Sequence, residues 1–218
     1  MTQGKVLDIL AFGAHPDDVE LGCGGTLLKL AKLGYRTGIV DLTRGEMGTR
    51  GTPEEREKEA QSAAQLLKAD LRVNLRIPDA NIENSKENQL KVIECIREYT
   101  PRMILLPYPE DRHPDHIHAS HLVKEAAFYS GLKKLQGSSL PPHRPSRLIY
   151  YMMTNEFTPS FIVDISEEFE GKIAALKAHT SQFHNPEYPG EETFISSRNY
   201  WEAIEFRARH FGWLAGVR

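Results

Sequence analysis

Two short segments hold the side chains whose types and spacing could bind a metal ion. The first is the turn Ala14-His15-Pro16-Asp17-Asp18, which follows an apolar run and precedes a helical pattern. A nucleotide-binding turn at this place would be rich in glycine, and two carboxylates would repel phosphate. Imidazole and carboxylate are instead ordinary ligands of zinc and similar divalent cations. The alternative is that Asp17 or Asp18 only caps the next helix, and the spacing does not decide which aspartate would bind a metal.

The second segment, Asp111-Arg112-His113-Pro114-Asp115-His116, also follows an apolar run and opens a helical pattern. Because His113 and His116 are three residues apart, both imidazole rings can converge where the helix begins. At about 100° per helical residue, His118 is rotated by about 200° from His116, and His121 by about 140° in the other direction. We therefore expect His118 and His121 to lie outside the ligand set of the metal.

The elements that must position these segments alternate along the first half of the chain. Apolar runs predict strands over residues 6–12, 37–42, 71–75 and 103–106, and amphipathic patterns predict helices over 21–33, 53–67, 87–99 and 115–130. The alternation predicts an α/β fold, a Rossmann-like open sandwich with a mostly parallel sheet and helices on both faces. Ligands of such sheets bind at the carboxyl ends of the strands, where both segments lie.

The second half of the chain has a less regular pattern. It predicts strands over residues 148–152 and 161–165, helices over 166–179 and 198–211, and a polar loop over 182–192. The length of 218 residues favours one domain over residues 1–218.

Composition excludes several classes of protein. The chain has 40% hydrophobic residues and a net charge of −3, from 27 basic and 30 acidic residues, which argues against disorder and against a strongly basic nucleic-acid-binding surface. The sequence contains no apolar run as long as the ~20 residues of a membrane span. We expect a cytoplasmic protein that binds neither nucleic acid nor membrane. Cys23 and Cys95 are too few for a thiolate cage, so a metal site must use histidine and carboxylate.

The motifs HPDD and RHPDH, the intervening LTRGEMGTRGTPEEREKEA and the later PHRPSR together resemble the LmbE-like zinc-dependent N-acetylglucosaminyl de-N-acetylases. Within that family the sequence is most similar to the deacetylases that act on N-acetylglucosaminyl-malate in bacillithiol biosynthesis. The resemblance implies one Zn²⁺ per subunit, held by His15, Asp18 and His116. It also implies that Asp17 is the general base and that His113 assists the tetrahedral intermediate.

The same resemblance implies which residues bind the substrate and how many subunits assemble. It places Glu46 and Arg56 against the sugar, Arg144 near the active site, and Tyr200 near the oxyanion. The alternative for Glu46 and Arg56 is that they are a solvated loop charge and an ordinary helix-surface charge. The family resemblance also implies a homo-oligomer, a hexamer.

The chemistry of amide hydrolysis agrees with these roles. Zinc with three protein ligands leaves a position for water, lowers the pKa of that water towards ~7 and polarises the acetyl carbonyl. Asp17 would take the proton, and a protonated His113 would stabilise the oxyanion. Because a nearby dication lowers the pKa of a histidine, His113 would need a carboxylate partner, for which Asp111 and Asp115 are the local candidates.

The predicted function is therefore the removal of an N-acetyl group from an N-acetylglucosamine conjugate, most simply N-acetylglucosaminyl-malate, with release of acetate and the amino sugar. The alternatives are deacetylation of another N-acetyl sugar such as chitobiose, a phosphoesterase with two metal ions ~3.5 to 4 Å apart, and a non-catalytic nucleotide- or metal-binding module. The non-catalytic alternative leaves Asp17 and His113 unexplained.

Overall fold

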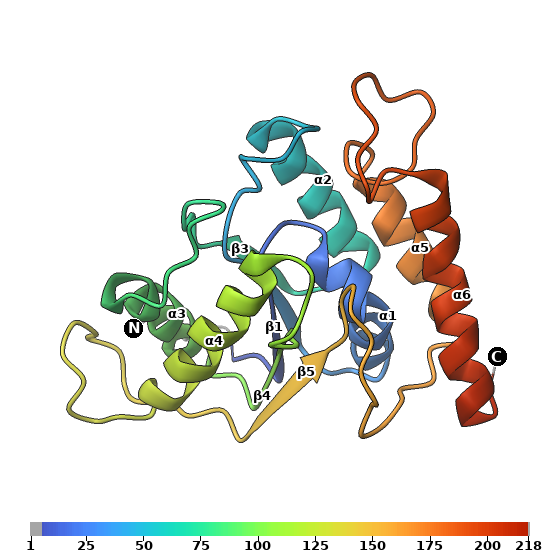
Figure 1. Ribbon diagram of the computed structural model, residues 1–218. Coiled ribbons are helices and arrows are strands. Elements are labelled where there is room, and N and C mark those ends of the chain that lie inside the picture. Colours follow the sequence, from blue (N-terminus) through green and yellow to red (C-terminus); the bar gives the residue numbers. More distant parts are fainter. Residues whose placement is uncertain (1–5, 218) are drawn as a thin grey trace.

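The computed structural model describes residues 6–217, in which strands and helices alternate through most of the chain (Figure 1). The strands are β1 (Ile9–Gly13), β2 (Thr37–Asp41), β3 (Leu71–Asn74), β4 (Met103–Pro107) and β5 (Arg147–Tyr151). The helices are α1 (Asp18–Lys32), α2 (Pro53–Leu66), α3 (Lys86–Tyr99), α4 (Pro114–Tyr129), α5 (Phe169–Ala178) and α6 (Arg198–Ala215). The strand order is β3-β2-β1-β4-β5 and every neighbouring pair is parallel. The predicted α/β sandwich is confirmed.

Helices cover both faces of the sheet, with α3 and α4 on one side and α1, α2 and α5 on the other (Figure 1). Alternate residues of β1 serve the two layers, because side chains of a strand point to opposite faces in turn. Leu10 and Phe12 pack in the core beneath α3 and α4, and Ile9 and Ala11 pack in the core beneath α1, α2 and α5. Burial on both faces explains the apolar runs that predict these strands.

The start of α2 follows the pattern expected from the sequence. The Thr52 hydroxyl accepts a hydrogen bond from the Glu55 backbone N–H at 3.1 Å, and the Glu55 carboxylate accepts one from the Thr52 N–H at 3.3 Å. This reciprocal cap satisfies two N–H groups that the first helical turn leaves without partners. Within residues 6–217, no helix combines the length and the apolar character needed to cross a bilayer.

The prediction of a strand over residues 161–165 is wrong, because this segment forms no strand pairing. Phe161, Ile162 and Val163 are exposed, and only Ile165 packs on a helix. Ile165 lies against Gly25 of α1, where a β-carbon on the glycine would come within 2.5 Å of the isoleucine side chain. The Lys29 ammonium, also on α1, donates a hydrogen bond to the Asp164 carbonyl. From sequence alone, a short apolar run that forms a strand cannot be told from one that only packs against a helix.

A buried group of charges ties the first turn of α1 to β2, β3 and the segment after α5. The Arg72 guanidinium makes two hydrogen bonds of 2.8 Å to the Asp41 carboxylate and a further one to Glu20. The Glu20 carboxylate also lies 3.1 Å from Nε2 of His179. All four side chains are buried, so the charges of Arg72, Asp41 and Glu20 are compensated inside the protein instead of by water.

We expect Arg72→Ala to lower the free energy of unfolding by about 3 to 5 kcal/mol, because it leaves the carboxylates of Asp41 and Glu20 buried without their cation. Urea denaturation followed by circular dichroism measures the loss. Arg198→Ala, which breaks an exposed pair with Glu202 on α6, is the matched control. Equal loss of stability in the two variants would contradict a special role for the buried charges.

Candidate metal centre and active site

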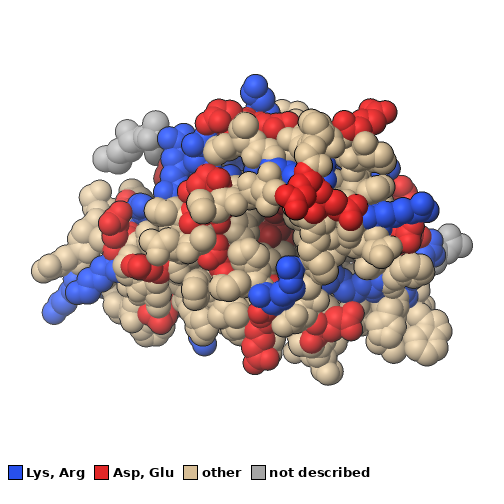
Figure 2. Space-filling model, turned by 45° about the horizontal axis from the view of Figure 1, so that its top comes forward, with Lys and Arg blue, Asp and Glu red and all other residues tan. Residues whose placement is uncertain are grey.

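The two segments singled out in the sequence meet at the carboxyl edge of the sheet. Strands β1 and β4 are parallel neighbours in which Ile9 pairs with Met103, so the turns that follow them open at the same edge. The loop after β3, which carries Asp79, reaches the same place. Figure 2 is an oblique view in which this edge comes forward, and it shows basic and acidic side chains mixed across the surface.

His15, Asp18 and His116 form a buried group whose possible ligand atoms all lie within 4.8 Å of one another. Asp18 lies between the two imidazoles, with one carboxylate oxygen 3.5 Å from Nδ1 of His15 and the other 3.2 Å from Nε2 of His116. Two imidazoles and one carboxylate are a donor set that suits zinc and related divalent cations. His15 also belongs to a second, overlapping group with His113 and Asp115.

Further carboxylates orient the two imidazole rings from behind. Asp111 accepts a hydrogen bond of 2.8 Å from Nδ1 of His116, and its other oxygen accepts bonds from the backbone N–H groups of Thr154 and Asn155. This contact leaves Nε2 of His116 facing Asp18, which is how metal-binding histidines are usually oriented.

The ring of His15 is held in the same way by two carboxylates, of which Asp79 is not among the residues that the sequence motifs indicate. Its Nε2 lies 3.1 Å from Asp79 and 3.3 Å from Asp115. Asp79 lies in the sequence Pro78-Asp79-Ala80, beyond the third strand of the sheet. Its position past the carboxyl end of a parallel strand was the available signal.

The acidic surroundings raise the pKa of both buried histidines. Burial opposes the protonation of His116, but Asp18 and Asp111 together raise its pKa to about 9. Burial likewise opposes the protonation of His15, and hydrogen bonds to Asp115, Asp18 and Asp79 raise its pKa well above the ordinary value. The site therefore favours positive charge strongly, and a divalent cation supplies such charge to the same atoms.

Asp17 and Asp18 are adjacent in sequence but have different environments. Asp17 makes no side-chain capping hydrogen bond to α1. The alternative that Asp17 only caps this helix is therefore excluded. Burial raises its pKa to about 6, an effect that Arg56 opposes and that the charge of Asp18 reinforces. Burial also disfavours the charged form of Asp18, but His116 and His15 hold its pKa well below its ordinary value.

His113 caps the start of α4 at the mouth of the group. Its ring centroid lies 4.9 Å from that of His15 and 5.0 Å from that of His116. The expectation that Asp111 or Asp115 keeps His113 protonated is wrong, because those carboxylates contact His116 and His15, and Nδ1 of His113 accepts the backbone N–H of Asp115. Burial and the charges of His15 and His116 lower its pKa.

The remaining histidines of the segment lie where the helical rotation predicts. His118 and His121 are exposed on α4, and Nδ1 of His118 approaches Asp115 only to 4.0 Å. Neither belongs to the buried group of possible ligands.

Three of the four expected substrate-binding residues lie at or near this edge. Glu46 is exposed, and its carboxylate accepts hydrogen bonds from the backbone N–H groups of Arg44 and Asp79. The ring of Tyr200 lies 5.1 Å from that of Phe194, which also contacts Arg112, the neighbour of His113. Burial raises the pKa of Tyr200 to about 12, and the charges of Asp17 and Asp18 contribute to this rise. Arg56 is 3% exposed and contacts Asp17.

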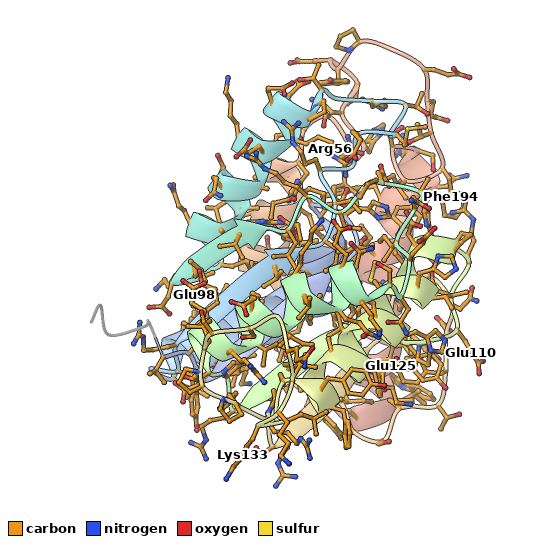
Figure 3. The ribbon with its side chains drawn as sticks, turned by 90° about the vertical axis from the view of Figure 1, so that its left-hand side faces the viewer. Arg56, Glu98, Glu110, Glu125, Lys133 and Phe194 are labelled. Atoms are coloured by element: carbon orange, nitrogen blue, oxygen red, sulfur yellow. The ribbon has the colours of Figure 1, made fainter. Side chains whose placement is uncertain are left out.

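The structure does not bring Arg144 to the site. Its guanidinium donates to the Phe128 carbonyl at 2.8 Å and stacks on the Phe128 ring, at the last turn of α4. His113 caps the first turn, so α4 separates the two by roughly 20 Å at 1.5 Å per residue. In Figure 3, Arg56 of α2, which contacts Asp17, lies towards the top, and Lys133, which follows α4, lies at the bottom.

Comparisons with known proteins agree with this site. Residues 10–127 match the family model described as PIG-L, GlcNAc-PI de-N-acetylase, and this region contains both ligand segments. The conserved protein TT1542 from Thermus thermophilus has a solved structure that superimposes with a TM-score of 0.86 at 42% identity, over 97% of this chain and 91% of that chain.

Two curated relatives bear on the substrate. Diacetylchitobiose deacetylase of Thermococcus kodakarensis is 31% identical over 92% of this chain and 83% of its own length. A probable N-acetyl-alpha-D-glucosaminyl L-malate deacetylase 2 of Bacillus anthracis is 29% identical over 80% of this chain and 81% of its own length. The comparisons therefore do not support a special closeness to the malate deacetylases.

The family match covers more than half of the chain, and the 31% identical relative extends the similarity over nearly all of it. The chain belongs to the PIG-L family of de-N-acetylases and is a metal-dependent amidohydrolase.

Proposed function

We propose that this protein removes the acetyl group from an N-acetylglucosamine conjugate, with one zinc ion held by His15, Asp18 and His116. The buried arrangement of these three side chains, with Asp17 beside them, is the observation that carries the proposal. Bound zinc would supply Lewis acidity to the amide carbonyl and to water. The products are acetate and the free amino sugar.

In this proposal Asp17 and His113 divide the proton transfer and the charge stabilisation. The Asp17 carboxylate accepts the proton of the attacking water and then donates it to the departing nitrogen. Because Nδ1 of His113 accepts a backbone N–H, its Nε2 is the nitrogen that carries a proton towards the substrate. A donor at that position stabilises the oxyanion when the carbonyl becomes tetrahedral. Tyr200 and Glu46 border the sugar.

The number of possible metal sites distinguishes this reaction from the phosphoesterase alternative. Within residues 6–217, the two groups that could hold a metal both depend on His15, so they do not offer two independent ligand sets. A phosphoesterase of this kind usually needs two metal ions.

For the rest of the substrate we retain N-acetylglucosaminyl-malate and diacetylchitobiose as the two candidates. An anionic aglycone needs a cation at the mouth of the site, and Arg144 is too distant to supply it. Arg112 precedes His113, is exposed, and stacks at 4.1 Å on the ring of Phe194, which is 51% exposed. We propose that Arg112 and Phe194 border the aglycone.

We further propose that the chain forms a homo-oligomer. The family resemblance implies that this oligomer is a hexamer. The outer face of α6 carries large apolar side chains in contact with solvent, among them Phe206 and Trp213. Exposed apolar patches of this kind are typical of surfaces that a partner covers.

Asp17→Asn and Asp18→Asn should have different effects, because a general base contributes rate and a ligand contributes metal affinity. We expect Asp17→Asn to keep zinc and to lose about 10² to 10⁴ in kcat, and Asp18→Asn to lose zinc. Elemental analysis and acetate release from both candidate substrates measure the two effects. Equal loss of zinc in the two variants would mean that the roles of the aspartates are misassigned.

His113→Ala should keep zinc and lower kcat by about 10² to 10³, the usual effect of removing one oxyanion donor. His118→Ala is the control on the same helix and should change kcat by less than about tenfold. Zinc content and kcat are measured together for both variants. If His113→Ala lost its zinc, the residue would be a ligand, and if its kcat were unchanged, the proposed donor role would fail.

Arg112→Ala should lower kcat/KM for N-acetylglucosaminyl-malate relative to diacetylchitobiose by about 10- to 100-fold, the value of a charge-assisted hydrogen bond. Arg144→Ala should leave this ratio unchanged because Arg144 lies at the far end of α4. The comparison uses wild type and both variants on both substrates. A ratio that changes only in Arg144→Ala would contradict the proposed position of the aglycone.

A further inference from the structure

A cleft beside the edge strand β5 takes no part in the proposed reaction. It has a volume of about 1280 Å³ and lies between α1, β5, the segment 157–166 and helices α5 and α6. In Figure 1 the chain after β5 runs between β5 and α6. None of the possible metal ligands lines the cleft, and neither does Asp17. Pockets that hold small molecules commonly have volumes of about 300 to 1000 Å³, so this cleft has room for a sizeable ligand.

The cleft is long, and its walls are largely apolar. Leu21 near the start of α1 and Leu33 just after its end both line it, and at 1.5 Å per helical residue they are roughly 18 Å apart. Ile149 of β5 and Phe211 of α6 add further apolar surface. An elongated apolar cleft favours a ligand with an extended apolar body, because burial of such a body removes the apolar surface of both partners from water.

A buried cation lies at one end of this cleft. Lys172 of α5 lines the cleft, is 8% exposed and donates a hydrogen bond of 2.8 Å to the Leu21 carbonyl, which places its ammonium at the Leu21 end. Burial lowers the pKa of Lys172 to about 8, and the charge of Arg207 contributes to this fall, so the ammonium stays mostly protonated at pH 7. Two of its three N–H groups have no hydrogen-bond acceptor within residues 6–217.

Arg207 of α6 adds a second positive charge near Lys172. It lines the cleft and its guanidinium donates a hydrogen bond to the neutral Met153 carbonyl. In the described part of the chain, no carboxylate lies within 4.0 Å of either cation. The carboxylates that line the cleft belong to the exposed residues Asp164 and Glu170. An anion that reached Lys172 would therefore compensate a charge whose burial is otherwise costly.

We propose that this cleft binds a free amphipathic anion, with a carboxylate head and one extended alkyl chain. The head contacts Lys172 and Arg207 at the Leu21 end, and the chain lies along α1 towards Leu33. A compact anion would leave the apolar length of the cleft unfilled, and a neutral apolar molecule would leave Lys172 without an acceptor. The binding site shares no residue with the metal centre, so the proposal does not depend on the proposed function.

Calorimetric titration of the zinc-loaded protein with decanoate tests the charged end of the site. The buffer contains acetate, which competes with decanoate for the metal. We expect Lys172→Met to weaken decanoate binding by about 10- to 100-fold, the value of hydrogen bonds to a charged group, and to change the affinity for neutral 1-decanol by less than about threefold. Lys177→Met, which replaces an exposed lysine of the same helix, is the matched control. Absence of decanoate binding to the wild type, or equal decanoate affinity in the wild type and Lys172→Met, would overturn the proposal.

A second variant tests the apolar length without altering the cation. Thr26 of α1 lines the cleft between Leu21 and Leu33. Thr26→Trp should weaken the binding of decanoate and of 1-decanol alike by about tenfold or more, because the indole occupies the path of the alkyl chain. Acetate release should stay at the wild-type rate, because this residue is not part of the metal centre. The binding results stand whether or not the wild type releases acetate.

Sedimentation velocity on the same samples tests a second copy of the chain as the occupant. If the cleft holds a free ligand, the wild type and Thr26→Trp should have the same oligomeric state. Dissociation of an assembly by Thr26→Trp, together with no decanoate binding to the wild type, would make the cleft an interface between copies and overturn the proposal.

Discussion

The parallel pairing of β1 with β4 is the constraint on which the site depends. His15 and His116 are about one hundred residues apart in sequence, and the register of these two strands opens the turns after them at one edge of the sheet. Helices α1 and α4 begin there, on opposite faces, so each contributes its first turn to the same small volume. His15, His116 and the aspartates of both turns are thereby buried against one another instead of against solvent.

Because the site is buried, its excess of negative charge determines what it can bind. Four aspartates, Asp18, Asp79, Asp111 and Asp115, surround the two buried imidazoles. Such an excess of acidic groups away from water is costly unless positive charge enters. The raised pKa of both histidines is one response to that field, and a divalent cation is another.

The first turn of α1 connects this chemistry to the stability of the fold. Asp17 and Glu20 are three residues apart, and each meets a buried arginine from a different element: Arg56 of α2 and Arg72 of β3. Arg72 compensates carboxylates inside the layers of the sandwich, whereas Arg56 lies 3.4 Å from the carboxylate of Asp17, which we propose to be the base. Arg56 also donates a hydrogen bond to the Gly45 carbonyl, so α1, α2 and the loop between β2 and α2 meet at this place.

The sequence by itself determined the α/β class, most of the elements and the two ligand segments, because apolar periodicity, caps and short motifs are local properties. The rotation of successive helical residues likewise separated His118 and His121 from His116. Only the tertiary structure decided what depends on contacts between distant segments: Asp79 behind His15, Asp111 and Asp115 turned to His116 and His15 instead of His113, and Arg144 at the far end of α4. It also decided that Arg56 is buried against Asp17, because the approach of α2 to the start of α1 is set by the packing of the whole sandwich and cannot be seen in any single stretch of chain.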